Sequence, residues 1–340
     1  MTQPTPLARK AAPSAALLGQ RMLSLVGDKL MATEALFRRE LSSDVPFIAD
    51  AGRYISEGGG KRVRPALLLL CARLLGHDSA EEVTYAAVVE FIHSATLIHD
   101  DIIDLAPLRR GRPTAQTLWG NHKTVLLGDW IYTKAMQLAL EHGRVEVIRR
   151  LCAATLAMTE GELLVLDRLG APDLSRDEYY QIIDRKTALL FAAACSIPSL
   201  IEPVRPEAGA ALERFGRQLG LCFQVVDDLL DFTARESDLG KPVLSDLREG
   251  KLTLPLLLLL PRVPAGDRTK VETVLADRAF ERVAAEEILE LVAREGTLAE
   301  AESLAEAHAE AARRELAYFP PSETRDILEL APDFVLHRNS

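Results

Sequence analysis

The stretch Phe91-Ile92-His93-Ser94-Ala95-Thr96-Leu97-Ile98-His99-Asp100-Asp101-Ile102-Ile103-Asp104 decides the fold of this chain, because it is mostly apolar and ends in three acids. The same acidic pattern, Asp-Asp-x-x-Asp, recurs at Asp227-Asp228-Leu229-Leu230-Asp231, again within an apolar stretch. On an α-helix the second and third acids lie about 100° and about 40° around the axis from the first, so each cluster forms one carboxylate patch. Both stretches are therefore predicted to be largely buried helices that carry patches of like charge.

Carboxylates held this close together must raise their pKa values or bind cations. Mg²⁺ prefers oxygen ligands, takes one or two carboxylates and completes its octahedron with phosphate oxygens. A single acidic pair is as often a solvated helix face as a site, but two copies with identical spacing favour a site. We therefore predict that the clusters bind Mg²⁺ together with a diphosphate. The predicted metal ligands are Asp100, Asp101, Asp104, Asp227, Asp228 and Asp231.

Glycine-bearing basic loops accompany both acidic clusters. Arg109-Arg110-Gly111-Arg112 follows the first, Gly240-Lys241-Pro242 and Gly250-Lys251 follow the second, and Gly58-Gly59-Gly60-Lys61-Arg62-Val63-Arg64 precedes both. Glycine lets the backbone approach closely, and Lys and Arg bind phosphate through point-charge and bidentate contacts. Each loop alone could be a solvated charge run. In a chain of net charge −10, basic loops beside acidic clusters indicate a metal-chelated polyanion rather than nucleic acid as the ligand.

Apolar residues recur with helical period along nearly the whole chain, and no convincing period-two alternation interrupts them. The aromatic content is only 5%, and no Pro/Gly/Ser-rich linker divides the sequence. We predict an all-α protein in which residues 15–340 form one helical domain and residues 1–14 a disordered N-terminus. The predicted helices lie at roughly 18–41, 66–75, 81–104, 122–140, 145–166, 176–195, 208–232, 253–260, 268–278, 282–294, 297–316 and 323–336.

Localisation follows from the cysteines, the apolar runs and the N-terminus. Cys71, Cys152, Cys195 and Cys222 lie in apolar stretches without metal-ligand spacing and are predicted to be reduced, buried thiols. The longest apolar run, 252–260, is about half of the roughly 20 residues that span a bilayer, so we expect a core helix there. The first 27 residues lack acids, as in an organellar transit peptide, but they also lack a basic amphipathic face. A bacterial cytoplasmic protein is therefore favoured over an organellar one.

These motifs occur together in the order typical of one family. The chain resembles the trans-isoprenyl diphosphate synthases, or polyprenyl synthetases, from about residue 45 to its C-terminus. The resemblance is carried by Gly59-Gly60-Lys61-x-x-Arg64-Pro65, His93 to Asp104, Arg109-Arg110-Gly111-x-Pro113-Thr114, Lys186-Thr187, Gly220-x-x-Phe223-Gln224-x-x-Asp227-Asp228-x-x-Asp231, Gly240-Lys241-Pro242 and Asp246-Leu247-x-x-Gly250-Lys251-x-Thr253-x-Pro255. Gln116, where many members have His or Asn, departs from the pattern and is assigned no role.

The resemblance implies the isoprenoid synthase fold, a single large helical bundle around a central cavity, and a symmetric homodimer. It also implies a prenyltransferase with two or three Mg²⁺ ions per active site. The implied substrates are an allylic diphosphate, farnesyl or geranyl, and isopentenyl diphosphate. The allylic C–O bond ionises, the isopentenyl alkene attacks, and a proton is lost. Membrane contact is expected only at the periphery, for product release.

The same resemblance assigns roles to single residues. Asp100, Asp104 and Asp227 match direct metal ligands, and Asp101, Asp228 and Asp231 match positions that bind through water or orient the site. The positions that match the isopentenyl diphosphate site are Lys61, Arg64, His93 and Arg110. Arg109, Lys186 and Lys241 match contacts to the allylic diphosphate, with Lys251 as a further contact. Thr187 and Gln224 match groups that stabilise the developing cation.

Helical spacing supports part of this assignment independently. His93 lies about 20° from Asp100 around the helix, and Gln224 lies between Asp227 and Asp228, so both face the metal side. Without its motif, His93 would be interpreted as a core histidine. His99 points about 100° away from Asp100 and is left out of the chemistry.

Product length should depend on how deep the apolar pocket runs below the first acidic patch. Ala95 and Thr96, about one turn before Asp100, are small, and in the family small residues there accompany long products. Thr96, about 40° from Asp100, faces the pocket better than Ala95, whose role rests on the resemblance. We expect roughly 8–10 isoprene units, the length used for quinone side chains.

Four alternatives remain. A farnesyl or geranylgeranyl diphosphate synthase differs only in product length. A class I terpene cyclase or a head-to-head condensing enzyme ionises similar substrates, but cyclases typically have one Asp-rich motif and need no basic site like that of Lys61 and Arg64. A non-catalytic synthase subunit could lose its metal-binding acids without penalty, so the two intact acidic clusters argue against it. A divalent-metal-binding protein without enzyme activity would not need the basic loops.

Overall fold

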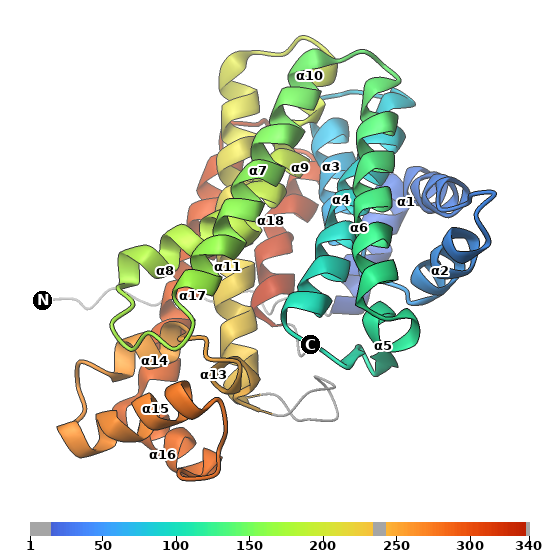
Figure 1. Ribbon diagram of the computed structural model, residues 1–340. Helices are drawn as coiled ribbons and strands as arrows, with labels where there is room; N and C mark the ends of the chain where they lie inside the picture. Colours follow the sequence, from blue (N-terminus) through green and yellow to red (C-terminus); the bar gives the residue numbers. More distant parts are fainter. Residues whose placement is uncertain (1–14, 234–242, 338–340) are drawn as a thin grey trace, which may run out of the picture.

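The computed structural model describes residues 15–233 and 243–337, which are helical apart from loops and one short hairpin (Figure 1). The elements in chain order are α1 (Ala15–Glu40), α2 (Pro46–Glu57), α3 (Val63–Leu74), α4 (Glu81–Ile103), β1 (Leu108–Arg109), β2 (Arg112–Pro113), α5 (Ala115–Trp119), α6 (Asn121–Leu140), α7 (Val145–Asp167), α8 (Arg176–Ile183), η1 (Asp184–Ala188), α9 (Leu189–Ser196), α10 (Pro198–Ile201), α11 (Pro206–Thr233), α13 (Ser245–Arg248), α14 (Leu254–Leu259), α15 (Ala265–Asp277), α16 (Ala285–Glu295), α17 (Thr297–Leu316) and α18 (Glu323–Leu336). The prediction of an all-α protein is confirmed.

Long helices form the centre of the molecule. α4 packs against α6, α3 and α1, and α11 packs against α17 and α9. The core between the helices is apolar, and its largest buried side chains include Tyr85, Phe91, Phe191 and Phe215. In Figure 1 α4 and α11 run in the same direction, so their C-terminal ends lie at the same end of the bundle. The two acidic clusters are therefore brought to one end of the molecule, where α13 and α14 also lie.

The basic loop after α4 forms the hairpin. β1 pairs with β2 in antiparallel register, with Arg109 opposite Arg112. The two residues of the turn, Arg110 and Gly111, have φ values of 53° and 72°. Positive φ at both central residues is what a type I′ turn requires. The strands of two residues each are too short for an alternating pattern to reveal them in the sequence.

Two further expectations can be compared with the structure. Among the described residues, no helix is long and apolar enough to cross a membrane. Cys71, Cys195 and Cys222 are buried free thiols, as predicted, but the prediction is wrong for Cys152, which is exposed. Cys152 lies on the same face of α7 as Leu156 and Leu163, and both of these leucines are exposed too. An apolar sequence pattern does not distinguish a core-facing side chain from an exposed apolar one.

The predicted helix 176–195 is interrupted by a π-helical turn, η1, which carries Lys186 and Thr187. Such turns occur frequently at functional sites, because the extra residue turns neighbouring side chains toward a new direction. Here η1 packs between α7 and α11. A Cβ built on Gly161 of α7 would lie 2.8 Å from the Lys186 backbone nitrogen, and one on Gly220 of α11 would lie 2.6 Å from Ala188 Cα. Two glycines therefore let both helices approach the π-turn closely.

We expect Gly220→Ala to lower the free energy of unfolding by about 1–3 kcal/mol, because overpacking against Ala188 outweighs the gain of roughly 1 kcal/mol in helix propensity. Gly27→Ala in α1 is the matched control, since its added methyl would only meet Leu23 of the same helix, at 3.7 Å. The control should be neutral or stabilising. Urea unfolding of both variants measures the difference, and equal stabilisation of the two would contradict close packing at Gly220.

Candidate active site

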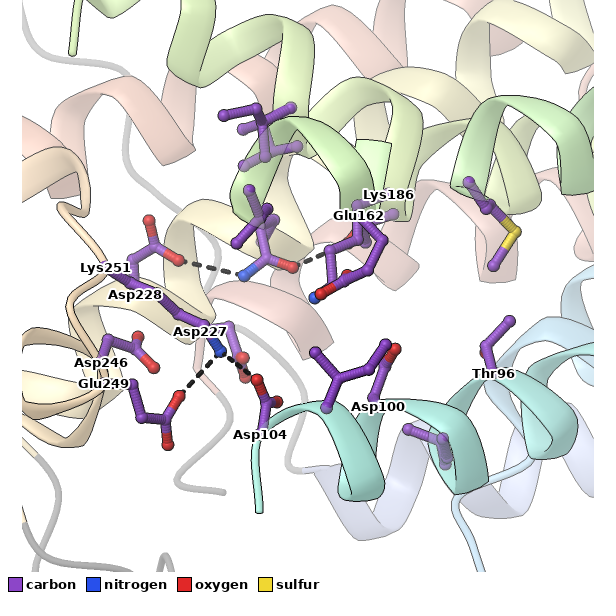
Figure 2. A pocket seen from close by; sticks show the side chains of 18 of the residues that line it. Thr96, Asp100, Asp104, Glu162, Lys186, Asp227, Asp228, Asp246, Glu249 and Lys251 are labelled. Carbon is purple, nitrogen blue, oxygen red and sulfur yellow. Dashed lines mark hydrogen bonds and ion pairs between the residues drawn. The ribbon is translucent and has the colours of Figure 1, made fainter. Parts of the chain in front are cut away.

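A cavity of about 700 Å³ lies between the C-terminal part of α4, α7, η1, the C-terminal part of α11 and the segment before α14. Figure 2 shows the acidic side chains of α4 and α11 on this cavity, with Lys186 and Glu162 beside Asp100. Polar and apolar side chains line different parts of it. The cavity has an acidic part, a basic part and an apolar part.

The first acidic cluster divides between the cavity and its supporting loop. Asp100 and Asp104 line the cavity. Burial raises the pKa of Asp100 to about 6, and the nearby Glu162 and Asp104 raise it as well, whereas Lys186 lowers it. Asp101 is buried and lies outside the lining, where its Oδ1 accepts a hydrogen bond of 2.7 Å from Arg109 Nε. Asp101 therefore orients Arg109 within the loop.

In the second cluster, Asp227 and Asp228 line the cavity and Asp231 does not. Asp227 is exposed and lines the cavity. Asp228 is 3% exposed and accepts hydrogen bonds from Tyr179 (2.6 Å) and Gln224 (3.0 Å). Burial and the nearby Asp246 raise the pKa of Asp228 to about 7, although the hydrogen bonds from Tyr179 and Gln224 lower it.

Asp231 supports the segment that follows the second cluster. It is 2% exposed, and its carboxylate accepts hydrogen bonds from the Ser245 hydroxyl (2.7 Å), the Ser245 N–H (3.1 Å) and the Asp246 N–H (3.2 Å). These contacts fix the start of α13 against the end of α11. Of the six aspartates, Asp100, Asp104, Asp227 and Asp228 therefore line the cavity, whereas Asp101 and Asp231 lie outside the lining.

Two lysines lie among these carboxylates. Lys186 of η1 forms an ion pair with Glu162 of α7. Lys251 Nζ lies 2.8 Å from Asp104 Oδ1 and 2.7 Å from Glu249 Oε2, which links the end of α4 to the segment after α13 (Figure 2). Burial alone would lower the pKa of Lys251, but Asp104 and Glu249 together raise it. Lys251 is therefore a permanent cation at neutral pH.

The basic part of the cavity is lined by His93, Arg64, Arg109 and Arg110. The Arg64 guanidinium lies over the Phe191 ring, 4.4 Å from its centroid, and Arg110 Nη1 donates a hydrogen bond of 2.8 Å to the Gly59 carbonyl. Burial and the charges of Arg64 and Arg110 hold the pKa of His93 well below its usual range, so its imidazole is neutral. Lys61 is exposed and lies outside the lining. Lys241 falls outside the described residues.

The apolar part of the cavity begins one turn before Asp100 on α4. Thr96 and Leu97 line it from α4, and Met158 lines it from α7. The Thr96 hydroxyl donates to the His93 carbonyl of its own helix at 2.8 Å, so it needs no polar partner in the cavity. Ala95 is 2% exposed and lies within the core rather than in the lining. Thr187 and Gln224 line the opposite wall and are joined by a hydrogen bond of 2.8 Å.

Several residues of the cavity were not found from the sequence. Glu162, Glu249 and Tyr179 line it, but each is a common residue type at a position without a recognisable motif. Gln116, which was assigned no role, donates from Nε2 to the carbonyls of Asp101 (2.7 Å) and Ala106 (2.8 Å) and thereby holds the loop after the first cluster. His99 also lines the cavity, but its Nε2 donates to the Val125 carbonyl of α6 at 3.2 Å.

The donor set fits hard divalent ions that are shared with a phosphate ligand. Among the described residues, no three His, Cys, Asp or Glu side chains converge closely enough to enclose an ion by themselves. Mg²⁺ commonly takes only one or two carboxylates and draws its other ligands from water and substrate phosphates. Carboxylates on two helices across one cavity, with arginines beside them, match this requirement.

Comparison with known proteins agrees with this geometry. The family model "Polyprenyl synthetase" matches residues 45–292, which is more than half of the chain. The chain belongs to the polyprenyl synthetase family. The chain is 37% identical over 309 residues to an octaprenyl diphosphate synthase of Escherichia coli, with 91% of this chain and 95% of the relative covered.

Other relatives in the polyprenyl synthetase family differ in the product that their names give. A short chain isoprenyl diphosphate synthase of Methanothermobacter thermautotrophicus is 36% identical over 314 residues, with 91% of this chain and 95% of the relative covered. Among solved structures, a polyprenyl synthase of Caulobacter crescentus complexed with calcium and isoprenyl diphosphate superposes with a TM-score of 0.91 at 36% identity. That superposition covers 98% of this chain and all of the other.

Proposed function

We propose that this protein is a prenyltransferase that condenses an allylic diphosphate with successive molecules of isopentenyl diphosphate to give a long-chain, all-trans polyprenyl diphosphate. The observation that carries the proposal is the arrangement of one cavity with an acidic part, a separate basic part and an apolar part. The acidic part suits a metal-bound diphosphate, the basic part suits a second diphosphate, and the apolar part suits a hydrocarbon tail.

The allylic diphosphate is assigned to the acidic part. Asp100, Asp104 and Asp227 would hold Mg²⁺ there, and bound Mg²⁺ neutralises the charge that develops on the leaving diphosphate. Lys186, Arg109 and Lys251 line the cavity, and the first two would contact the same diphosphate, with Lys251 beside it. In this structure both lysines are paired with carboxylates, so they are held in place before the substrate arrives. Lys241 is expected to contact the allylic diphosphate as well.

Isopentenyl diphosphate is assigned to the basic part. Arg64 and Arg110 supply charge-assisted hydrogen bonds, and the neutral His93 imidazole adds one uncharged donor. Lys61, which is exposed on the loop before α3, would reach the same diphosphate from the rim. Thr187 and Gln224 line the cavity and would offer oxygen atoms to the positive charge that develops on the allylic carbon. Their oxygens stabilise that charge without forming a bond to it.

The experiment that tests this function is incubation with farnesyl diphosphate, labelled isopentenyl diphosphate and Mg²⁺, followed by chromatography of the products. We expect long-chain product in the wild type and none after chelation by EDTA. Asp100→Ala should lower kcat by more than about a hundredfold, because the leaving diphosphate loses its ion. Full turnover in excess EDTA would refute the metal-assisted ionisation.

A second variant in the same assay separates the two diphosphate sites. Arg64→Ala should raise the KM of isopentenyl diphosphate about tenfold or more and change that of the allylic substrate little, since one charge-assisted hydrogen bond contributes about 1.5–3 kcal/mol. An equal rise in the KM of both substrates would mean that the residues are wrongly divided between the two sites. Thermal unfolding of each variant checks that a loss of activity is not a loss of fold.

Product length is assigned to the apolar part. Thr96 lines the cavity four residues before Asp100, about 6 Å along the helix axis, and leaves space for a growing tail. The octaprenyl relative supports a long product of roughly eight units or more, and the short-chain relative keeps a farnesyl or geranylgeranyl diphosphate synthase as the alternative. Ala95 can affect the product length only by changing how the core packs, because it does not reach the cavity in this structure.

Thr96→Phe should shorten the product to about three or four isoprene units without abolishing ionisation, because the acidic and basic parts stay in place. Ala95→Phe is the comparison, since it changes the same turn of α4 from the core side. Chromatography of the products measures both variants, and thermal unfolding detects overpacking. A folded, active Thr96→Phe enzyme that still makes the wild-type length would show that the tail does not pass this residue.

We also infer that the protein is a homodimer. Exposed apolar side chains gather on α6 and α7, and Leu126, Leu140, Leu156 and Leu163 are 65%, 60%, 63% and 56% exposed. Large exposed apolar areas on a soluble protein mark interaction surfaces. A symmetric pair of chains would bury the same helices from both copies.

Light scattering at micromolar concentration should therefore give about twice the chain mass of 37.3 kDa. Leu156→Glu should shift the protein toward the single chain, because it places a charge in the interface without touching the cavity. The matched control is Glu146→Gln at the exposed start of α7. A wild-type protein of single-chain mass would refute the inference.

A further inference from the structure

A chain of hydrogen bonds connects α8 with the π-turn through the wall of the cavity. The Tyr179 hydroxyl donates to Asp228 Oδ2 at 2.6 Å, and Gln224 Nε2 donates to the other oxygen, Oδ1, at 3.0 Å. The Thr187 hydroxyl in turn donates to Gln224 Oε1 at 2.8 Å. All four residues line the cavity, and Tyr179 and Asp228 are each only 3% exposed.

The chemistry of the partners fixes the direction of this chain. Both carboxylate oxygens of Asp228 act as acceptors here, so the amide of Gln224 turns its NH₂ group toward Asp228. Its carbonyl oxygen then lies on the Thr187 side, toward the cavity. The two ends of a glutamine amide have nearly the same shape and opposite polarity. Without an oriented acceptor, the amide could turn over and direct its positive NH₂ end to the place where the oxygen now lies.

Tyr179 is the residue that orients this acceptor. Its hydroxyl donates to Oδ2 at 2.6 Å, and the other hydrogen bond to Oδ2 among the described residues is a longer one of 3.5 Å from the Leu254 N–H. The position of Tyr179 is fixed in turn by the start of α8, where Ser175 and Glu178 form a reciprocal capping box. The Glu178 N–H donates to Ser175 Oγ at 3.2 Å, and the Ser175 N–H donates to Glu178 Oε2 at 2.9 Å. A rigid helix start thus places the phenol against Asp228.

We propose that Tyr179 is a positioning residue for prenyl transfer, which acts through Asp228 to hold the carbonyl oxygen of Gln224 toward the allylic cation. In the ionisation step the allylic C–O bond breaks, and its electron pair leaves with the diphosphate. The allylic carbon is then positively charged, and an oriented amide oxygen lowers the energy of that charge while an NH₂ group would raise it. The inference rests on the proposed function, because the polarity of the amide matters only where a cation develops.

The test begins with Tyr179→Phe, which removes one oxygen and keeps the ring. We expect kcat to fall about tenfold or more, as for the loss of a hydrogen bond to a charged group. The KM values of both substrates and the Mg²⁺ concentration for half-maximal activity should stay within about twofold, because no substrate contact is removed. Tyr180→Phe is the matched control, since it loses the same atom from the next residue without touching Asp228. A kcat for Tyr179→Phe equal to that of the control would overturn the inference.

A double variant separates positioning from a general structural role. If Tyr179 acts through the Gln224 amide, the variant Tyr179→Phe/Gln224→Leu should have the same kcat as Gln224→Leu alone. Two independent structural effects would instead multiply, because separate losses add as free energies. Multiplied losses in a folded double variant would therefore also overturn the inference.

Two unnatural residues of nearly equal size at position 179 distinguish the loss of the hydrogen bond from a folding defect. p-Aminophenylalanine keeps a hydrogen-bond donor and should restore most of the lost kcat, whereas p-methylphenylalanine fills the same volume without a donor and should not. Equal activity of these two proteins would overturn the inference even if Tyr179→Phe unfolds. Failure of the proposed function looks different, because the wild type would then make no product, and both proposals would fall together.

Discussion

Repulsion among carboxylates around one cavity is the constraint on which the rest of this structure depends. Asp100, Asp104 and Asp227 approach it from two helices, and Glu162, Glu249 and Asp246 line it as well. Two like charges 4 Å apart repel each other by about 4 kcal/mol at the effective dielectric constant of a protein surface. The fold reduces this repulsion with two lysines, Lys186 and Lys251, each placed against a carboxylate. Burial, together with the charges of Glu162 and Asp104, still raises the pKa of Asp100.

The position of each lysine depends on a local feature of the backbone. Lys186 lies on a π-turn that fits between α7 and α11 only because Gly161 and Gly220 have no side chains. Lys251 lies on the segment after α13, which Asp231 fixes through Ser245 and Asp246. Asp231 of the second cluster therefore positions the segment that carries Lys251, and Lys251 pairs with Asp104 of the first cluster. Asp101 serves the first cluster similarly by holding Arg109. Each Asp-Asp-x-x-Asp pattern thus contains acids that face the cavity and acids that position cations.

Much of the fold and part of the site could be predicted from the sequence, and the division has a physical reason. Helical period and acidic spacing are local properties, so they predicted the long helices and the placement of Asp100 and Asp227. Contacts between distant segments are not local, which is why the sequence revealed neither the pairing of Lys186 with Glu162 nor the hydrogen bond from Tyr179 to Asp228. The exposure of Cys152 was missed for the same reason, since an apolar helix face has the same sequence pattern whether it is buried in the core or exposed.

Overall similarity cannot decide the product length in this family, because an octaprenyl and a short-chain relative are almost equally similar to the chain, at 37% and 36% identity. The names of both relatives give a diphosphate as the product. A substitution in the apolar part of the cavity would change its depth without disturbing the balance of charge in the other parts. In this chain Thr96 and Met158 face that part from two helices. Met is flexible and adapts to irregular space, so Thr96, fixed by its hydrogen bond to the His93 carbonyl, is the more rigid of the two side chains.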